Sequence, residues 1–347
     1  MGRTENVMVF EDTEKMCKDH QRIRDSVKRS TDGQKLILEN DELAETDKKR
    51  YESPAKVVVS KKRTFEAAAA YKGTKTAVHN FASASNPGGG VVNGANAQEE
   101  CLCRCSGLYF CLNTKQMWDG FYEPHRRTRD PLHNDDVIFT PEVTVFKTDT
   151  AQPKLMNEKD WYDVDVITCA APNLRSRPSN GYNSGDGNQA VKIKDKDLLA
   201  LHEKRLRRIL DVAVLEEDET VILGAFGCGA FMNNPQVVAM AAKNVIKEYL
   251  HAFKNIEFAV YCSPRDDQNY RRQHQGYRLP RSATERECRI HEEVCRCLPK
   301  EVPLDMVGPL RRNRRSSGRR YRFHDVQKGS RANFAGHHRR RGSPLPV

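Results

Sequence analysis

Residues 80–100 read NFASASNPGGGVVNGANAQEE, which joins the end of an apolar segment to three glycines and the acidic start of a helix. Glycine has no Cβ, so its backbone can approach an anionic ligand closely, and each residue of Gly88–Gly90 offers an N–H group. The residues Gln98, Glu99 and Glu100 then supply two carboxylates and an amide, the groups that acid–base work on a neighbouring bond requires. The same pattern also fits a surface turn before a helix with acidic first residues. A second glycine loop further along the chain favours the first interpretation over the surface turn, namely that residues 88–100 form a phosphate-binding loop next to an acid.

That second loop is the segment LGAFGCGAFMNNP at residues 223–235. Glycines between a strand and a helix N-terminus make a good diphosphate site, because N–H groups and the helix dipole both favour negative charge. A tight strand-to-helix crossover explains the same spacing, and this alternative stays open. Phe226 and Phe231 flank the glycines and are candidates to pack on a ribose or base, although core packing is the usual fate of Phe.

The chain around these loops alternates strands with helices, and its pattern predicts an α/β fold. Such alternation gives a mixed, mostly parallel sheet with helices on both faces, and ligands bind beyond the carboxyl ends of its strands. The expected strands are residues 35–38, 56–60, 76–80, 136–140, 143–146, 163–169, 220–224 and 256–262. The expected helices are residues 12–29, 63–71, 98–112, 195–215 and 235–253, with a helical turn at 114–118.

Composition divides the chain into three parts. Residues 1–55 form a predicted N-terminal helical extension, and residues 56–265 form the predicted catalytic core. Residues 266–347 are polar to Arg-rich and have little to bury, so we expect a largely disordered basic tail. Within the core, residues 175–188 are rich in Ser, Gly, Asn and Pro, which predicts a mobile loop.

The positive charge of the chain is concentrated in that tail. The net charge is +11, while residues 1–307 carry 46 basic and 46 acidic side chains. The Arg-rich segment 311–341, which also contains aromatic residues, has the composition of a polyanion-binding segment. A solubilising or nuclear-localisation segment has the same composition, so both interpretations stay open.

Other segments point to an intracellular protein, cytoplasmic or nuclear, and to no membrane contact. No apolar stretch is long enough to span a bilayer, and the N-terminus lacks the apolar region of a signal peptide. The count of eleven cysteines is odd, which indicates reduced thiols. Cys101, Cys103 and Cys105 form a C-x-C-x-C run, but no zinc-type CxxC spacing occurs, so we expect no metal site.

The pair Glu99 and Glu100 holds the reactive candidates. Adjacent residues of a helix point about 100° apart, so both carboxyls are not expected to serve the same atom. We expect one to act as general acid and the other to fix sugar hydroxyls. Repulsion and burial raise a carboxyl pKa and the helix N-terminus lowers it, so the sign of the shift stays open.

These motifs together carry a resemblance to a known family. The segments NFASASNPGGG-x7-QEE, CLCRCSGLYFCLN, DVITCAAPNLR and ILGAFGCGAF-x-NNP, in this order, resemble the microbial-type poly(ADP-ribose) glycohydrolases. The similarity runs from about Asn6 to Cys262. It implies a macrodomain-like three-layer sandwich that hydrolyses the ribose–ribose glycosidic bond of poly(ADP-ribose) without metal or organic cofactor.

The resemblance also implies roles for single residues. Glu100 corresponds to the acid that protonates the leaving ribose hydroxyl and then activates water, and Glu99 to the residue that holds the ribose. The first glycine loop would contact the terminal ribose and diphosphate, the second would wrap the diphosphate, and Phe231 would pack on the ribose. The implied substrate-binding residues are Gln98, Asn86, Gly88, Gly89, Gly90, Gly227, Cys228, Gly229, Ala230 and Phe231.

Three functions fit these residues. The first is an exo-acting, monomeric glycohydrolase that releases ADP-ribose from polymer ends. The second is a hydrolase of mono-ADP-ribose on protein or nucleic acid, and the third is a non-catalytic ADP-ribose reader. A reader has no need for two repelling carboxylates beside a diphosphate, so the pair favours an enzyme.

Overall fold

The computed structural model describes residues 1–180 and 185–262 of the chain. The predicted tail at residues 266–347, its Arg-rich segment 311–341 and the cysteines Cys288, Cys295 and Cys297 lie outside the described residues.

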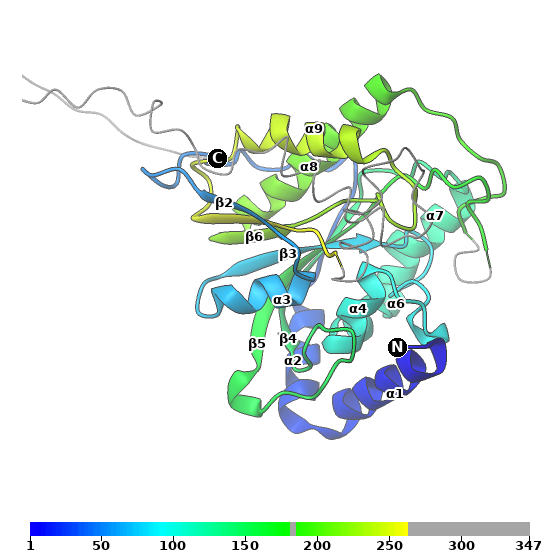
Figure 1. The fold of residues 1–347 in the computed structure, drawn as a ribbon, viewed down its shortest axis with the longest axis vertical. Coiled ribbons are helices and arrows are strands. Elements are labelled where there is room, and N and C mark those ends of the chain that lie inside the picture. The colour runs from blue at the N-terminus through cyan, green and yellow to red at the C-terminus, as the bar shows by residue number, and fades with distance from the viewer. Residues whose placement is uncertain (181–184, 263–347) are drawn as a thin grey trace, which may run out of the picture. The chain divides into compact units, whose positions relative to one another are not determined.

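A seven-stranded sheet forms the centre of the described structure (Figure 1). Its strand order is β1-β4-β5-β3-β6-β7-β2; β4 runs antiparallel to both of its neighbours, and all other neighbours pair in parallel. The predicted mixed, mostly parallel sheet is therefore confirmed. The strands are β1 (Lys35–Ile37), β2 (Lys56–Ser60), β3 (Thr76–Ala82), β4 (Val137–Val145), β5 (Tyr162–Ala170), β6 (Thr220–Leu223) and β7 (Asn255–Ala259).

Helices cover both faces of this sheet, which makes three layers (Figure 1). The longer helices are α1 (Arg3–Asp19), α2 (Gln21–Asp32), α4 (Gln98–Cys105), α8 (Asp195–Leu215) and α9 (Pro235–Ile246). The shorter ones are α3 (Thr64–Ala68), α5 (Leu108–Leu112), α6 (Lys115–Met117) and α7 (Glu123–Thr128). Single turns complete the set: η1 (Ala69–Tyr71), η2 (Val91–Asn93), the π-helical η3 (Trp118–Tyr122) and η4 (Glu158–Asp160).

The period-2 alternation of each strand supplies a hydrophobic core on each face of the sheet. In β6, Val221 and Leu223 belong to the core under α8 and α9, whereas Ile222 belongs to the core under α3, α4 and α5. A smaller cluster that includes Cys17 and Trp161 holds the N-terminal helices against the chain between β4 and β5.

Three predicted helices end or break at positions that carry no clear local signal. Residues 12–29 belong to α1 and α2, which are separated at His20 because its backbone is extended. Residues 98–112 divide into α4 and α5 at Ser106, which is also extended and pairs with Val145. The helix at 235–253 ends at Ile246 and continues as turns.

The two strands predicted around Pro141 are one strand, β4. Its pairing with β5 shifts between Thr140 and Val143, and Glu142 has a φ of +50°. Proline has no N–H to donate to a ladder, so a β-bulge here lets one strand continue past it.

The N-terminal segment adds an element to the sheet. Its strand β1 pairs antiparallel with β4 at the sheet edge, and α2 packs against β4. The proposed division of the chain at residue 55 stays a prediction.

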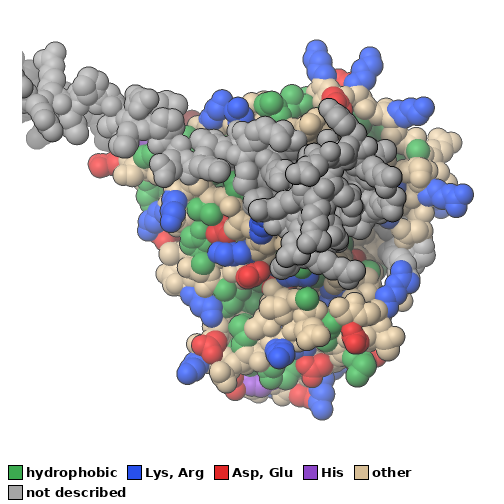
Figure 2. All heavy atoms as spheres, in the orientation of Figure 1, with side chains coloured by type: hydrophobic (Ala, Val, Ile, Leu, Met, Phe, Trp, Pro, Cys, Tyr) green, Lys and Arg blue, Asp and Glu red, His purple; other side chains and the backbone are tan. Residues whose placement is uncertain are grey.

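Charged side chains of both signs are mixed over the described part of the face shown in Figure 2. This agrees with the equal numbers of basic and acidic residues in positions 1–307. Within the described chain, no helix combines the length and apolar character needed to cross a bilayer.

Candidate active site

The two glycine loops meet at one edge of the sheet. They follow β3 and β6, which are parallel neighbours, so both loops leave the sheet at its carboxyl edge. A cavity of about 640 Å³ lies there. Both loops, the start of α4, and residues after β2, β5 and β7 line it.

Gln98 fixes the start of α4 to the sheet. Its Nε2 donates to the carbonyl of His79 at 2.8 Å and to Thr64 Oγ1 at 3.0 Å, and its Oε1 accepts from Phe81 N at 2.9 Å. Both ends of the amide are thus bonded to the protein, although the residue lines the cavity. The geometry gives Gln98 the role of orienting the two glutamates that follow it.

Glu99 is buried under the loop that follows β3. Its carboxylate accepts from Ser83 N at 2.7 Å, from Asn80 Nδ2 at 3.3 Å and from the N–H of Gly88. Burial, and next the charge of Glu100, raise the pKa of Glu99 well above 4.5, and the three donors do not offset them. The site therefore retains a carboxyl proton to a higher pH than an exposed glutamate would.

Glu100 differs from Glu99 in having an available oxygen. Its Oε1 accepts from Gly90 N at 3.0 Å, whereas its Oε2 is buried and has no hydrogen-bond partner in the described structure. The residue is 7% exposed and lines the cavity. A buried oxygen without a partner in a native site calls for an explanation, and a bound ligand supplies one.

The N–H groups of the glycine run bond to groups of the protein itself. The N–H groups of Gly88 and Gly90 donate to the two glutamates, and that of Gly89 donates to the carbonyl of Asn86 at 3.0 Å. These three N–H groups are thus bonded within the protein in this structure, and contact of the glycine run with the ribose and diphosphate stays a prediction. The run holds the acids in place.

One oxygen of each of the two carboxyls lies close to Gly89. A Cβ built on Gly89 would lie 2.6 Å from Oε1 of Glu100 and 3.2 Å from Oε2 of Glu99. Long side chains can converge on one point even when their Cα–Cβ bonds diverge. Both glutamates thus approach Gly89, and the division of roles between them stays a prediction.

The loop after β6 provides the free donors. Its fold is fixed by Gly227, with a φ of +73°, and by Asn233, whose Nδ2 donates to the carbonyl of Gly227 at 3.0 Å. The consecutive N–H groups of Gly229, Ala230 and Phe231 donate to no group among the described residues, and all three residues line the cavity. Consecutive free N–H groups form an anion-binding concavity.

Aromatic side chains divide between the core and the cavity. Phe226 is 5% exposed and packs on His79, with ring centroids 4.4 Å apart, so it belongs to the core. Phe231 lines the cavity, and the guanidinium carbon of Arg175 lies 5.4 Å from the centre of its ring.

Comparisons with known proteins show to which family this chain is similar. A family model described as the catalytic domain of microbial-type PARG matches residues 4–148. A crystal structure of poly(ADP-ribose) glycohydrolase from Thermomonospora curvata is 26% identical, covers 84% of this chain and 99% of its own, and gives a TM-score of 0.64. That from Deinococcus radiodurans in complex with ADP-ribose is 29% identical, with 78% and 98% covered and a TM-score of 0.58. A point mutant of the latter, also with ADP-ribose, is 30% identical, with 69% and 91% covered and a TM-score of 0.55.

This chain belongs to the microbial-type poly(ADP-ribose) glycohydrolase family. Among curated protein sequences, none matches it.

Most of the site residues implied by the family resemblance come together in the structure. Those that line the cavity are Gly89, Gly90, Gln98, Glu99, Glu100, Gly227, Gly229, Ala230 and Phe231. Asn86, Gly88 and Cys228 do not line it. The N–H group of Gly88 donates to the carboxylate of Glu99. The N–H group of Asn86 donates to Ser83 Oγ, and that of Cys228 donates to the carbonyl of Ala225, so both are used within their own loops. Direct ligand contacts of these three residues stay predictions.

Arg175 is a site residue that the sequence pattern did not indicate, because the pattern predicts only that a mobile loop begins there. In the structure Arg175 lines the cavity, and burial lowers the pKa of its guanidinium. The available signal was its place five residues beyond the carboxyl end of β5, in the quoted motif DVITCAAPNLR.

A second group that the sequence did not indicate lines another part of the cavity. The guanidinium carbon of Arg63 lies 4.1 Å from the centre of the Tyr261 ring, and its Nη1 lies 4.0 Å from Oδ1 of Asp149. That oxygen is buried and accepts no hydrogen bond from a described residue. Burial raises the pKa of Asp149 to about 6.

The C-x-C-x-C run is buried beside the acids. Cys101, Cys103 and Cys105 carry free thiols, and burial raises the pKa of each. In the described ranges, no three His, Cys, Asp or Glu side chains are grouped as metal ligands. The expected reduced state holds for seven described cysteines, whereas Cys262 is disulfide-bonded.

Proposed function

We propose that this chain hydrolyses the ribose–ribose O-glycosidic bonds of poly(ADP-ribose) and releases ADP-ribose from polymer ends. The observation that carries the proposal is Oε2 of Glu100, a buried carboxyl oxygen without a partner in the cavity. Family membership supports the reaction. The ADP-ribose complexes of the Deinococcus enzyme, and the Thermomonospora enzyme bound to the inhibitor ADP-HPD, support the ligand class.

Glu100 is the proposed general acid and base. Its carboxyl donates a proton to the glycosidic oxygen as the bond from that oxygen to the anomeric carbon breaks. The sugar passes through an oxocarbenium-like state. The Glu100 carboxylate then takes a proton from water, and the hydroxide adds to the anomeric carbon, which restores the acid.

Glu99 is the proposed ribose-binding partner and also maintains the proton supply. Burial, and next the charge of Glu100, raise the pKa of Glu99, so this carboxyl keeps its proton to a higher pH than an exposed glutamate does. A carboxyl proton is thus held next to Glu100, because both carboxyls approach Gly89.

The loop after β6 is the proposed diphosphate site. The N–H groups of Gly229, Ala230 and Phe231 have no acceptor among the described residues, and these residues line the cavity, so they are donors held in place before an anion binds. Residues 1–307 carry equal numbers of basic and acidic side chains, so the chain outside the tail has no net positive charge to attract an anion. Recognition of the anionic ligand therefore depends on local donors such as these.

Three further assignments belong to the proposal. The protein acts as a monomer inside the cell, in the cytoplasm or nucleus. Its substrate is the polymer or an ADP-ribosylated protein. The segment 311–341 adds a second contact to a polyanion, which is either the polymer itself or nucleic acid.

Product analysis after incubation with poly(ADP-ribose) tests this function. We expect monomeric ADP-ribose from the wild type, and a loss of about 10²- to 10⁴-fold in rate for Glu100→Gln, because the amide cannot transfer a proton. Binding of ADP-ribose, measured by calorimetry, should stay within about tenfold. The matched control is Glu248→Gln, whose carboxylate pairs with Arg207 on the surface and should release ADP-ribose normally.

Other products would replace the proposal with one of its alternatives. Release only from mono-ADP-ribosylated protein would identify a mono-ADP-ribosyl hydrolase. Tight binding of ADP-ribose without release from any substrate would identify a reader, and oligomeric products would contradict exo action.

A further inference from the structure

Asp186 is an acidic side chain inserted between two loops of the site. A Cβ on Gly185 would collide with Cβ of Ser85, and one on Gly187, where φ is +71°, would lie 2.7 Å from the carbonyl oxygen of Arg129. The close approach on both sides depends on glycine. Asp186 itself is 2% exposed.

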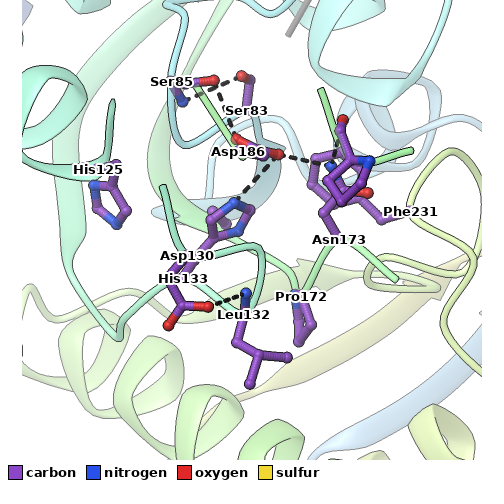
Figure 3. A network of polar contacts seen from close by, with 12 residues as sticks. Ser83, Ser85, His125, Asp130, Leu132, His133, Pro172, Asn173, Asp186 and Phe231 are labelled. Atoms are coloured by element: carbon purple, nitrogen blue, oxygen red, sulfur yellow. Dashed lines mark hydrogen bonds and ion pairs between the residues drawn. The ribbon is translucent and has the colours of Figure 1, made fainter. Parts of the chain in front are cut away.

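Each oxygen of the Asp186 carboxylate has a partner from a different loop (Figure 3). Oδ1 accepts from Ser85 Oγ at 3.2 Å, and Oδ2 accepts from Asn173 Nδ2 at 2.7 Å. Nε2 of His133 lies 3.4 Å from Oδ2, while Nδ1 of this ring bonds the carbonyl of Ala171 at 2.7 Å. The carboxylate thus connects the chain after β3 with the chain after β5.

The contact with Asn173 determines where Arg175 lies. Nδ2 of Asn173 must face Asp186 and the carbonyl of Pro178, at 3.1 Å, because both are acceptors only. The amide oxygen of Asn173 therefore faces Arg175, whose Nε donates to it at 3.0 Å. This orientation holds the guanidinium over the Phe231 ring in the cavity wall.

The contact with Ser85 connects Asp186 to Glu99 through a chain of hydrogen bonds. Oγ of Ser83 accepts the N–H groups of Ser85 and Asn86 at 3.3 Å and 3.2 Å, and Ser83 N donates to Glu99. Figure 3 shows Ser83 and Ser85 on one side of Asp186, and Asn173 and Phe231 on the other. One buried carboxylate therefore lies between the acids and the wall that carries Arg175.

Arg175 has the properties of an anion ligand. Within the described structure no carboxylate lies within ion-pair distance of its guanidinium, whose donors bond the amide oxygen of Asn173 and the carbonyl of Pro178. Its guanidinium is half-buried, and the charge of Asp186 opposes the effect of burial on its pKa. The free N–H groups of residues 229–231 line the same cavity.

We propose that Arg175 binds the diphosphate of the ligand beside these N–H groups, and that Asp186 is a positioning residue that holds Arg175 there through Asn173. The identity of the ligand as ADP-ribose rests on the proposed function. The position of Arg175 in the cavity wall is observed in the structure and is independent of that function.

A double-mutant cycle on the full chain tests both roles, with the Kd for ADP-ribose measured by calorimetry. Arg175→Gln should weaken binding about tenfold, and Asp186→Ala by a similar factor. The double variant should also bind about tenfold more weakly, not a hundredfold, because both changes remove the same phosphate contact. Adenosine, which lacks the diphosphate, should bind all variants equally.

The matched control is Asp218→Asn, a buried aspartate at the amino edge of the sheet, which should leave the Kd unchanged. If Asp186→Ala does not fold, Asp186→Asn keeps the shape and removes the charge, and the same non-additivity with Arg175→Gln is expected. Additive losses, or wild-type affinity in Arg175→Gln, would overturn the proposal. A wild type that binds ADP-ribose with this pattern but releases none from polymer would instead refute the proposed function alone.

Discussion

Gly89 lies against both carboxyl groups of the site, and its φ of +58° is in the left-handed region. Any side chain at this position meets two constraints, because the backbone conformation is strained for L residues and the space is occupied by Glu100 and Glu99. The glycine at this position is therefore required by the acids as well as by the turn.

We expect Gly89→Ala to lower kcat on poly(ADP-ribose) at least about tenfold, because the methyl group displaces the acid from its position. The matched control is Gly73→Ala, which has a φ of +92° and nothing within 4 Å of the added carbon. Both variants should lose about 1–2 kcal/mol of stability from backbone strain, and only the first should lose activity. Equal activity in the two variants would show that contact with the carboxyls is unimportant.

At the scale of elements, helix α1 supports the loop that joins the glycine run to α4. Asn6 Nδ2 donates to the carbonyl of Gly94 at 3.0 Å, and Thr13 Oγ1 donates to the carbonyl of Arg104 at 2.6 Å. Arg104 in turn donates to the carbonyl of Ala95 at 2.6 Å. The predicted N-terminal extension thus contacts α4, which carries Glu99 and Glu100, and the loop before it.

Asn6→Ala should destabilise the protein by about 1–2 kcal/mol, because it leaves a buried carbonyl without a donor. Since the affected loop precedes Gln98, we expect kcat/KM for ADP-ribose release to fall several-fold as well. Asn157→Ala, which removes an exposed asparagine, is the control and should change neither the melting temperature nor the rate. Full activity in a destabilised Asn6→Ala would mean that α1 contributes to stability alone.

At the scale of the whole molecule, buried acids lie at both the carboxyl and the amino ends of the strands, and those at the amino ends have no role in the candidate site. Those at the carboxyl edge serve the site. At the amino edge, Asp218 precedes β6, and neither of its carboxylate oxygens has a hydrogen-bond partner among the described residues. Burial, and next the charge of Asp165, raise the pKa of Asp218 well above 3.8. Because the folded state holds this proton more tightly than the unfolded state, the residue lowers stability as pH rises.

Asp218→Asn should therefore raise the free energy of unfolding at pH 7 by about 1–2 kcal/mol, since the amide carries no charge to bury. The gain should shrink as the pH falls and disappear below about 3, where the aspartate is protonated in both the folded and the unfolded state. Chemical denaturation at several pH values measures this. A gain that does not depend on pH would contradict the role of the charge.

The pattern of the sequence predicted the sheet well because its signals are local. Alternation in segments such as Val221–Leu223 marks a strand with two covered faces, and Pro235 marks the first position of α9. The breaks at His20 and Ser106 were missed because extended residues there are set by contacts with distant chain, such as the pairing of Ser106 with Val145.

The sequence by itself determined the α/β class, the position of both glycine loops at strand ends, and the candidate acids, since each depends on residues near one another in the chain. The tertiary structure decided which N–H groups are free, that Glu99 and Glu100 converge on Gly89, and that Asp186 lies between the acids and Arg175. These features depend on distances between residues as many as a hundred positions apart. Such distances are set by packing, and no local pattern encodes them.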